Sequence, residues 1–243
     1  NEALLHLTGM ESLQFISGDF EIAENDNLLD LSGLDFLNSI VGSFYILENE
    51  ALVNLTGLEN LNYVAGDLYI GEYWWQPRGG GNPSLVSLTG LNNLDSIGGC
   101  LYMLRNDLLT DLSGLENLSS IQGDLNIGAA FWSLEGGWYY IGNSALNNLS
   151  GLENLTSIGG SLEISGNDGL TSLTGLDYVE ANSITDLHIR GNNTLSSCAI
   201  QSICDYLAAP GGEVVIEENA PGCNSMEEVD SACVYVAVGR LDN

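Results

Sequence analysis

Residues 149–170 read LSGLENLTSIGGSLEISGNDGL, and variants of this pattern recur along most of the chain. The shared tetrapeptide is Leu-Ser/Thr-Gly-Leu, and its glycines are Gly9, Gly33, Gly57, Gly90, Gly114, Gly151 and Gly175. Successive glycines are 24, 24, 33, 24, 37 and 24 residues apart. The unit is therefore 24 residues long, and two units carry insertions. A period of this length predicts a solenoid, in which each unit buries its apolar side against its neighbours.

One segment of each unit has the alternation typical of a β-strand. Residues 66–70 read Gly-Asp-Leu-Tyr-Ile, so Leu68 and Ile70 are expected to point inward and Tyr69 outward. Stacked units would place these strands side by side in a parallel sheet. The sequence thus predicts one all-β domain, a right-handed β-solenoid of seven coils over residues 1–196, with insertions at about 71–81 and 128–142.

An asparagine follows the strand in every unit. The seven equivalent residues are Asn25, Asn49, Asn82, Asn106, Asn143, Asn167 and Asn192. An inward amide can pair with the backbone donors and acceptors that a tight turn leaves without partners. We therefore interpret this row as structural and not as a ligand site.

Residues 197–236 are expected to cap the last coil. Apolar residues at helical spacing predict a short helix across the open end of the stack: Ile200, Ile203, Cys204 and Leu207. A short strand is expected at 214–216, and Ser225 with an acidic residue three positions later indicates the start of a second helix. Residues 237–243 are expected to be a tail, or a linker to a C-terminal segment that is missing here.

The cap contains four of the five cysteines. They are Cys198, Cys204, Cys223 and Cys233, an even number in a small element, which favours two disulfides and an oxidising compartment. The three possible pairings stay open. Zinc is the alternative, but the spacing lacks the close cysteine pairs of structural zinc sites, and neither His6 nor His188 is near in sequence, so no metal is expected. Cys100 is expected to be a free thiol at an outward strand position.

The motif Leu-x-Ile-x-x-Asn-x-x-Leu at 162–170 resembles the leucine-rich-repeat signature. The 24-residue spacing with Leu-Thr-Gly-Leu is similar to that of the L domains of insulin- and growth-factor-type receptors. Leu-Ser-Ser-Cys at 195–198 and Asn-Ala-Pro-Gly-Cys at 219–223 resemble the cap of such repeats in secreted and surface proteins of Bacteroidota. The resemblance implies an exported chain, often displayed on the cell envelope through a further sorting domain.

The charge composition argues against some classes of binding partner. The 243 residues include 33 acidic and 4 basic side chains, for a formal net charge of −29, and lysine is absent. Such a field repels phosphate backbones and anionic headgroups, so we expect neither nucleic acid nor a membrane surface as a partner. No apolar run approaches the roughly 18 residues of a spanning helix. The acidic surface is interpreted as promoting solubility, with diffuse binding of divalent cations as the alternative.

The insertions contain all the tryptophans and several other aromatic residues. They are Trp74 and Trp75 with Tyr73 in the first insertion, and Phe131, Trp132, Trp138, Tyr139 and Tyr140 in the second. Both insertions follow a strand, in the third and fifth coils, so they should leave the same sheet edge about 10 Å apart. Long loops often carry binding residues, and aromatic rings provide contact area at low entropy cost. The alternative is that these rings pack on one another.

A row of tyrosines adjoins these insertions. Tyr45, Tyr69 and Tyr102 occupy the same outward strand position in successive coils. They would stabilise the sheet as cross-strand pairs or form a platform for a ligand. Together with the insertions they make the central coils the candidate site.

These features favour a non-catalytic binding or adhesion module that is secreted or displayed on the cell surface. Its partner would be a glycan or a protein, with no cofactor. The arginines Arg78, Arg105, Arg190 and Arg240 are scattered in sequence, and no carboxylate pair is marked as catalytic, so we do not expect an enzyme. The alternative function is a structural spacer or filament subunit. In that case the first coil, covered only by Leu4, Leu5 and Leu7, would contact another copy or domain.

Overall fold

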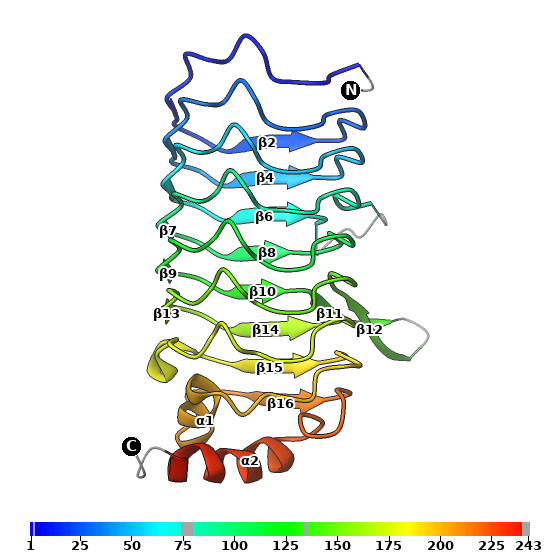
Figure 1. The fold of residues 1–243 in the computed structure, drawn as a ribbon, viewed down its shortest axis with the longest axis vertical. Coiled ribbons are helices and arrows are strands. Elements are labelled where there is room, and N and C mark those ends of the chain that lie inside the picture. The colour runs from blue at the N-terminus through cyan, green and yellow to red at the C-terminus, as the bar shows by residue number, and fades with distance from the viewer. Residues whose placement is uncertain (2, 74–79, 134–135, 240–243) are drawn as a thin grey trace.

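The computed structural model describes residues 1, 3–73, 80–133 and 136–239, which form a parallel β-solenoid (Figure 1). One wall of the solenoid is an eight-stranded parallel sheet with the order β16-β15-β14-β10-β8-β6-β4-β2. Its strands are β2 (Phe20–Ala23), β4 (Phe44–Leu47), β6 (Leu68–Gly71), β8 (Leu101–Met103), β10 (Leu125–Ile127), β14 (Leu162–Ser165), β15 (Leu187–Arg190) and β16 (Val214–Glu217). The predicted solenoid is confirmed.

A second wall is a six-stranded parallel sheet of two-residue strands. These strands are β1 (Phe15–Ile16), β3 (Ser39–Ile40), β5 (Tyr63–Val64), β7 (Ser96–Ile97), β9 (Ser120–Ile121) and β13 (Ser157–Ile158). In the next coil the 3-10 helix η1 (Ala181–Ser183) follows instead of a strand. This sheet was not predicted, because two residues are too few to show an alternation.

The structure has about eight turns, one more than the seven predicted. Strand β16 pairs with β15 in register, so the segment expected to be a short strand of the cap extends the main sheet. Asn219 extends the asparagine row, and its side chain accepts hydrogen bonds from the backbone and the amide of Asn192 at 3.1 and 2.9 Å. The eighth turn lacks the Leu-Ser/Thr-Gly-Leu motif, because helix α1 (Gln201–Ala208) occupies that part of the coil.

The repeat motif has a clear local cause. Gly57 has a φ of 110°, which side-chain-bearing residues rarely adopt, and its N–H donates to Glu59 Oε2 at 2.8 Å. Equivalent carboxylates or amides accept from the repeat glycine in the other six coils. The next residue, Asn60, donates to the backbone oxygen of Asp35 in the preceding coil at 2.6 Å. Some of the acidic side chains therefore stabilise the turns of the repeat.

The asparagine row forms a continuous buried ladder. Asn106 is typical: its Nδ2 donates to the backbone oxygens of Ile70 and Leu104 at 3.0 and 3.3 Å. Its backbone and side-chain nitrogens both donate to Asn143 Oδ1 in the next coil, at 3.1 and 3.0 Å. Every amide in the row is at most 9% exposed. The row pairs buried backbone groups that would otherwise have no partner.

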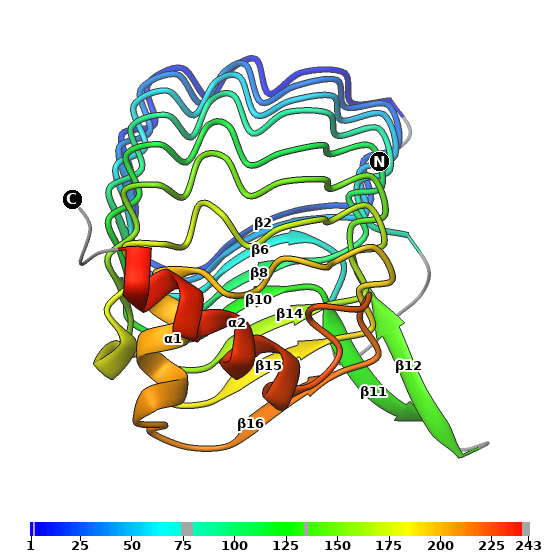
Figure 2. The ribbon, with the colours of Figure 1, turned by 60° about the horizontal axis from the view of Figure 1, so that its bottom comes forward.

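Two helices lie across the C-terminal end of the stack, α1 and α2 (Met226–Gly239) (Figure 2). Two disulfides fix this cap, Cys198–Cys223 and Cys204–Cys233, the second of which joins α1 to α2. The hydroxyl of Ser225 accepts from the Glu228 backbone N–H at 3.2 Å, as expected for the start of a helix. Disulfides of this kind persist in an oxidising environment.

Cys100 is free, but it precedes β8 and does not lie within it. Its Sγ accepts from the Asp124 backbone N–H at 3.2 Å, at a position where other coils use an aspartate or serine side chain. Burial raises the pKa of the Cys100 thiol. The Cys100 side chain is therefore part of the turn that precedes β8.

The N-terminal end of the stack exposes apolar side chains. Leu7 is buried and Leu4 is half-buried, but Leu5 and Phe15 are 52% and 54% exposed. Strands β2 and β1 are the edges of the two sheets. In the part of the chain that the structure describes, no helix is long and apolar enough to cross a membrane.

Candidate ligand-binding site

The second insertion forms a β-hairpin that projects from the edge of the main sheet (Figure 2). Its strands are β11 (Ala129–Ser133) and β12 (Gly137–Ile141), which are antiparallel. The first insertion begins after β6 and the second after β10, with only β8 between them, so both leave the same edge. Trp74 and Trp75 lie outside the described residues.

The hairpin presents two tryptophans to solvent. Trp132 and Trp138 are a cross-strand pair with ring centroids 5.5 Å apart and an interplanar angle of 85°. Trp132 is 65% exposed and Trp138 is 42% exposed. Phe131 pairs with Tyr139 one residue along, so these two point to the opposite face of the hairpin.

An arginine holds the face of the hairpin that carries Tyr139. Arg105 Nη2 donates to the Tyr139 hydroxyl at 2.8 Å. Its Nε lies 2.6 Å from Oε2 of Glu72, whose side chain is fully buried. A buried carboxylate therefore fixes the guanidinium, which in turn fixes the hairpin.

A second arginine holds the other face of the hairpin. Arg190 Cζ lies 4.6 Å from the ring centroid of Trp138, a cation–π distance. Its Nε and Nη2 donate to the two carboxylate oxygens of Glu163 at 3.3 and 3.2 Å. Tyr140 covers Gly191, where a Cβ would lie 2.5 Å from the ring. The hairpin is thus positioned on both sides before any ligand arrives.

Glu163 is the centre of a buried polar cluster. Besides Arg190, it accepts from the Ser165 hydroxyl and from His188 Nδ1, the latter at 3.0 Å. Burial alone would raise the pKa of Glu163, but these hydrogen bonds together lower it. The hydrogen bond to Glu163 raises the pKa of His188, whereas burial of the ring and the charge of Arg190 lower it. The Glu213 carboxylate, 3.7 Å from His188 Nε2, also raises this pKa.

This cluster predicts a pH dependence that nuclear magnetic resonance can measure. We expect the His188 imidazole to titrate above its ordinary pKa, and Glu163→Gln to bring that pKa down. The pKa of His188 is higher in the folded protein than in the unfolded chain. Protonated His188 therefore stabilises the fold fully when the pH is below the pKa of the unfolded chain, and this stabilisation is lost as the pH rises through the pKa of the folded protein. The signal is identified by its loss in His188→Gln. A His188 pKa that Glu163→Gln leaves unchanged would contradict this geometry.

The tyrosine row forms a stack on the outer face of the main sheet. The ring centroids of Tyr45 and Tyr69 are 5.0 Å apart, and those of Tyr69 and Tyr102 are 4.3 Å apart. Tyr69, between two rings, is only 4% exposed, so its role is to stack. Tyr73 tilts against Tyr45 at 5.9 Å and donates to Glu21 at 3.2 Å. Burial and the Glu21 carboxylate raise the pKa of Tyr73 to about 12.

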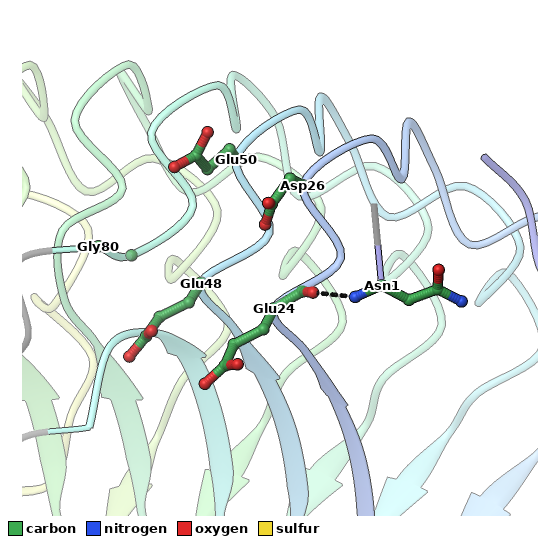
Figure 3. A pocket seen from close by; sticks show the side chains of 7 residues that line it. Asn1, Glu24, Asp26, Glu48, Glu50 and Gly80 are labelled. Carbon is green, nitrogen blue, oxygen red and sulfur yellow. Dashed lines mark hydrogen bonds between the residues drawn. The ribbon is translucent and has the colours of Figure 1, made fainter. Parts of the chain in front are cut away.

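A separate pocket of about 320 Å³ lies at the same edge near the N-terminal end (Figure 3). Its lining includes Glu24, Asp26, Glu48 and Glu50, and the Asn1 nitrogen donates to the Glu24 backbone oxygen. Glu24 and Glu48 have φ values of 55° and 54°. Among the described residues, no group of three or more His, Cys, Asp or Glu side chains is arranged to hold a metal ion.

The structure brings most of the predicted site residues into two adjacent groups, the hairpin aromatics and the tyrosine stack. Arg105 and Arg190 were not predicted as site residues, because they are scattered in sequence. Their positions in the repeat could have indicated this role, because Arg105 follows β8 and Arg190 ends β15, the neighbours on either side of the strands near the second insertion. Pairing each with a buried glutamate required the register of the sheet.

No family model, no curated protein and no solved structure matches the chain.

Proposed function

We propose that the chain is a non-catalytic binding module that recognises a glycan through the hairpin and the adjoining outer face of the main sheet. The observation that carries this proposal is the pair of exposed indoles, Trp132 and Trp138, on a hairpin fixed by Arg105 and Arg190. The C–H groups of a sugar ring pack well against such flat apolar rings, and a fixed platform reduces the entropy cost of binding. Glu163 accepts four hydrogen bonds, so it is a poor candidate for a general base.

The proposal includes the location of the protein. The two disulfides suggest an oxidising environment, which supports secretion or display on a cell surface. We further propose that the chain is related to leucine-rich-repeat and receptor L-domain proteins, of the type that Bacteroidota secrete or display. The repeat motif and the cap support this relation.

A glycan array tests the proposal. We expect the purified chain to bind a subset of glycans, and the double variant Trp132→Ala/Trp138→Ala to lose at least tenfold in affinity, because each indole supplies a large part of the contact area. Tyr178→Ala is the matched control, since Tyr178 is 71% exposed but precedes η1, away from the main-sheet edge that carries the hairpin.

The control should bind as the unchanged chain does. Absence of any bound glycan, or equal binding by the double variant, would refute the proposal. Thermal unfolding of each variant separates loss of the site from loss of the fold.

Exposed apolar side chains in the first coil favour a second candidate function, that of a structural or filament subunit. Leu5 and Phe15 are exposed, and among the described residues β1 and β2 each pair with a strand on one side only. Sedimentation at increasing concentration tests it: self-association that Phe15→Asp abolishes would support it, and a concentration-independent monomer would exclude self-assembly.

A further inference from the structure

The tyrosine stack ends at a hollow. The outward positions of the main sheet continue in register from Tyr102 to Asn126 and then Glu163. Because asparagine is short, no ring follows Tyr102, and a space of about 210 Å³ remains over Asn126. Tyr102, Asp124, Asn126, Glu163 and the first hairpin residues, Ala129 and Ala130, line it.

The hollow has room for one ring. Tyr102 and Glu163 are two strands apart, about 9.6 Å at the usual spacing. One side of Tyr102 is covered by Tyr69 at 4.3 Å, and the other borders the hollow. A flat ring over Asn126 would continue the stack by one strand.

The side-chain amide of Asn126 has a hydrogen-bonding defect. Its Nδ2 is buried and has no hydrogen-bond partner within the described ranges. A buried donor of this kind costs free energy and calls for an explanation. Rotation of the amide would turn this donor toward the hollow, where a ligand hydroxyl could accept from it.

The carboxylates of the hollow define the charge of its ligand. Glu163 has all four acceptor positions filled by Ser165, His188 and Arg190. Asp124 Oδ1 accepts from the Ser161 backbone N–H at 2.7 Å, and its Oδ2 has no partner in the described part of the chain. A hydroxyl can donate to that oxygen, whereas an anionic group would meet Asp124 and a chain of net charge −29.

We propose that this hollow binds one pyranose ring of a neutral glycan, with a ring face against Tyr102 and hydroxyls hydrogen-bonded to Asn126 and Asp124. The assignment rests on the proposed function and adds the ligand class and a second contact point beside the hairpin. A glycan that reaches both would span from the exposed indoles to the sheet face.

The test uses neutral methyl pyranosides as probes, with glucuronate as the charged counterpart, and follows the side-chain amide signal of Asn126 by nuclear magnetic resonance. We expect at least one neutral pyranoside to shift this signal in a saturable way. Glucuronate should bind at least tenfold more weakly. Asn126→Tyr, which fills the hollow and extends the stack, should reduce pyranoside affinity at least tenfold, measured from the ligand signals.

Two further variants serve as controls for this test. Asn126→Ala opens the hollow without filling it and should also weaken binding about tenfold, because it removes the amide. Tyr178→Ala, which removes an exposed ring away from the main-sheet face, should leave pyranoside binding unchanged. Thermal unfolding confirms that each variant folds.

Three results would overturn the assignment: no pyranoside shifts Asn126, Asn126→Tyr binds as the unchanged chain does, or glucuronate binds equally well. The result also separates the two proposals. If the array shows glycan binding that needs the tryptophans but not Asn126, the hollow is wrong and the proposed function stands. If the array is silent but a pyranoside fills the hollow, the hollow stands and recognition by the hairpin fails.

Discussion

Replacing Asn192 by alanine is expected to destabilise the protein by about 4 kcal/mol, since several buried groups lose their partners at about 1–3 kcal/mol each. The Asn192 side chain accepts from the backbone and side-chain nitrogens of Asn167 at 2.9 and 3.4 Å. It donates to the Ile164 backbone oxygen at 2.9 Å and to Asn219 Oδ1 at 2.9 Å. Chemical denaturation with a fixed slope measures the loss.

The adjacent residue provides a matched control. Asn193 is exposed and donates one side-chain hydrogen bond, to Asp168 at 2.6 Å. Asn193→Ala should therefore change stability by no more than about 0.5 kcal/mol. If the two variants lost the same stability, the ladder would not be the structural device that we describe.

Gly57→Ala is expected to cost about 3–5 kcal/mol, from backbone strain of about 1–3 kcal/mol plus a steric clash. Gly57 has a φ of 110°, and a Cβ there would lie 2.1 Å from the Leu31 backbone oxygen in the preceding coil. The coils would have to move apart to admit it. Thermal or chemical unfolding measures the effect.

The first coil separates the two causes. Gly9 has a similar φ of 104°, but a Cβ there would meet nothing within 4 Å. Gly9→Ala should carry the backbone strain alone, about 1–3 kcal/mol. Equal costs at Gly9 and Gly57 would mean that the close approach of coils does not explain the repeat glycine.

Most of the fold follows from the repeat, because each coil must bury the same positions and turn at the same places. Leu68 and Ile70 are buried as the alternation predicts, and the glycine spacing gives the length of a coil. The eighth turn has the same strand-to-asparagine spacing, since Ile216 precedes Asn219 as Ile189 precedes Asn192. It was missed because the glycine motif, used to count the coils, is absent there.

The candidate site could be predicted only in part. The aromatic insertions and the tyrosine row are visible in sequence, because both depend on local spacing. The hairpin pairing of Trp132 with Trp138 could be suspected from sequence but not placed against the sheet. The contacts of Arg105 with Glu72 and of Arg190 with Glu163 span 33 and 27 residues, so they depend on the stacking of coils around an insertion.

In the proposed function, the indoles of Trp132 and Trp138 contact the ligand. The most direct measurement is a proton–nitrogen correlation spectrum of the chain labelled at its four tryptophan side chains, titrated with the tightest glycan from the array. Single Trp→Phe variants assign the indole signals. We expect those of Trp132 and Trp138 to shift together and saturate. Shifts confined to Trp74 and Trp75, or no shift at saturating glycan, would contradict the claim.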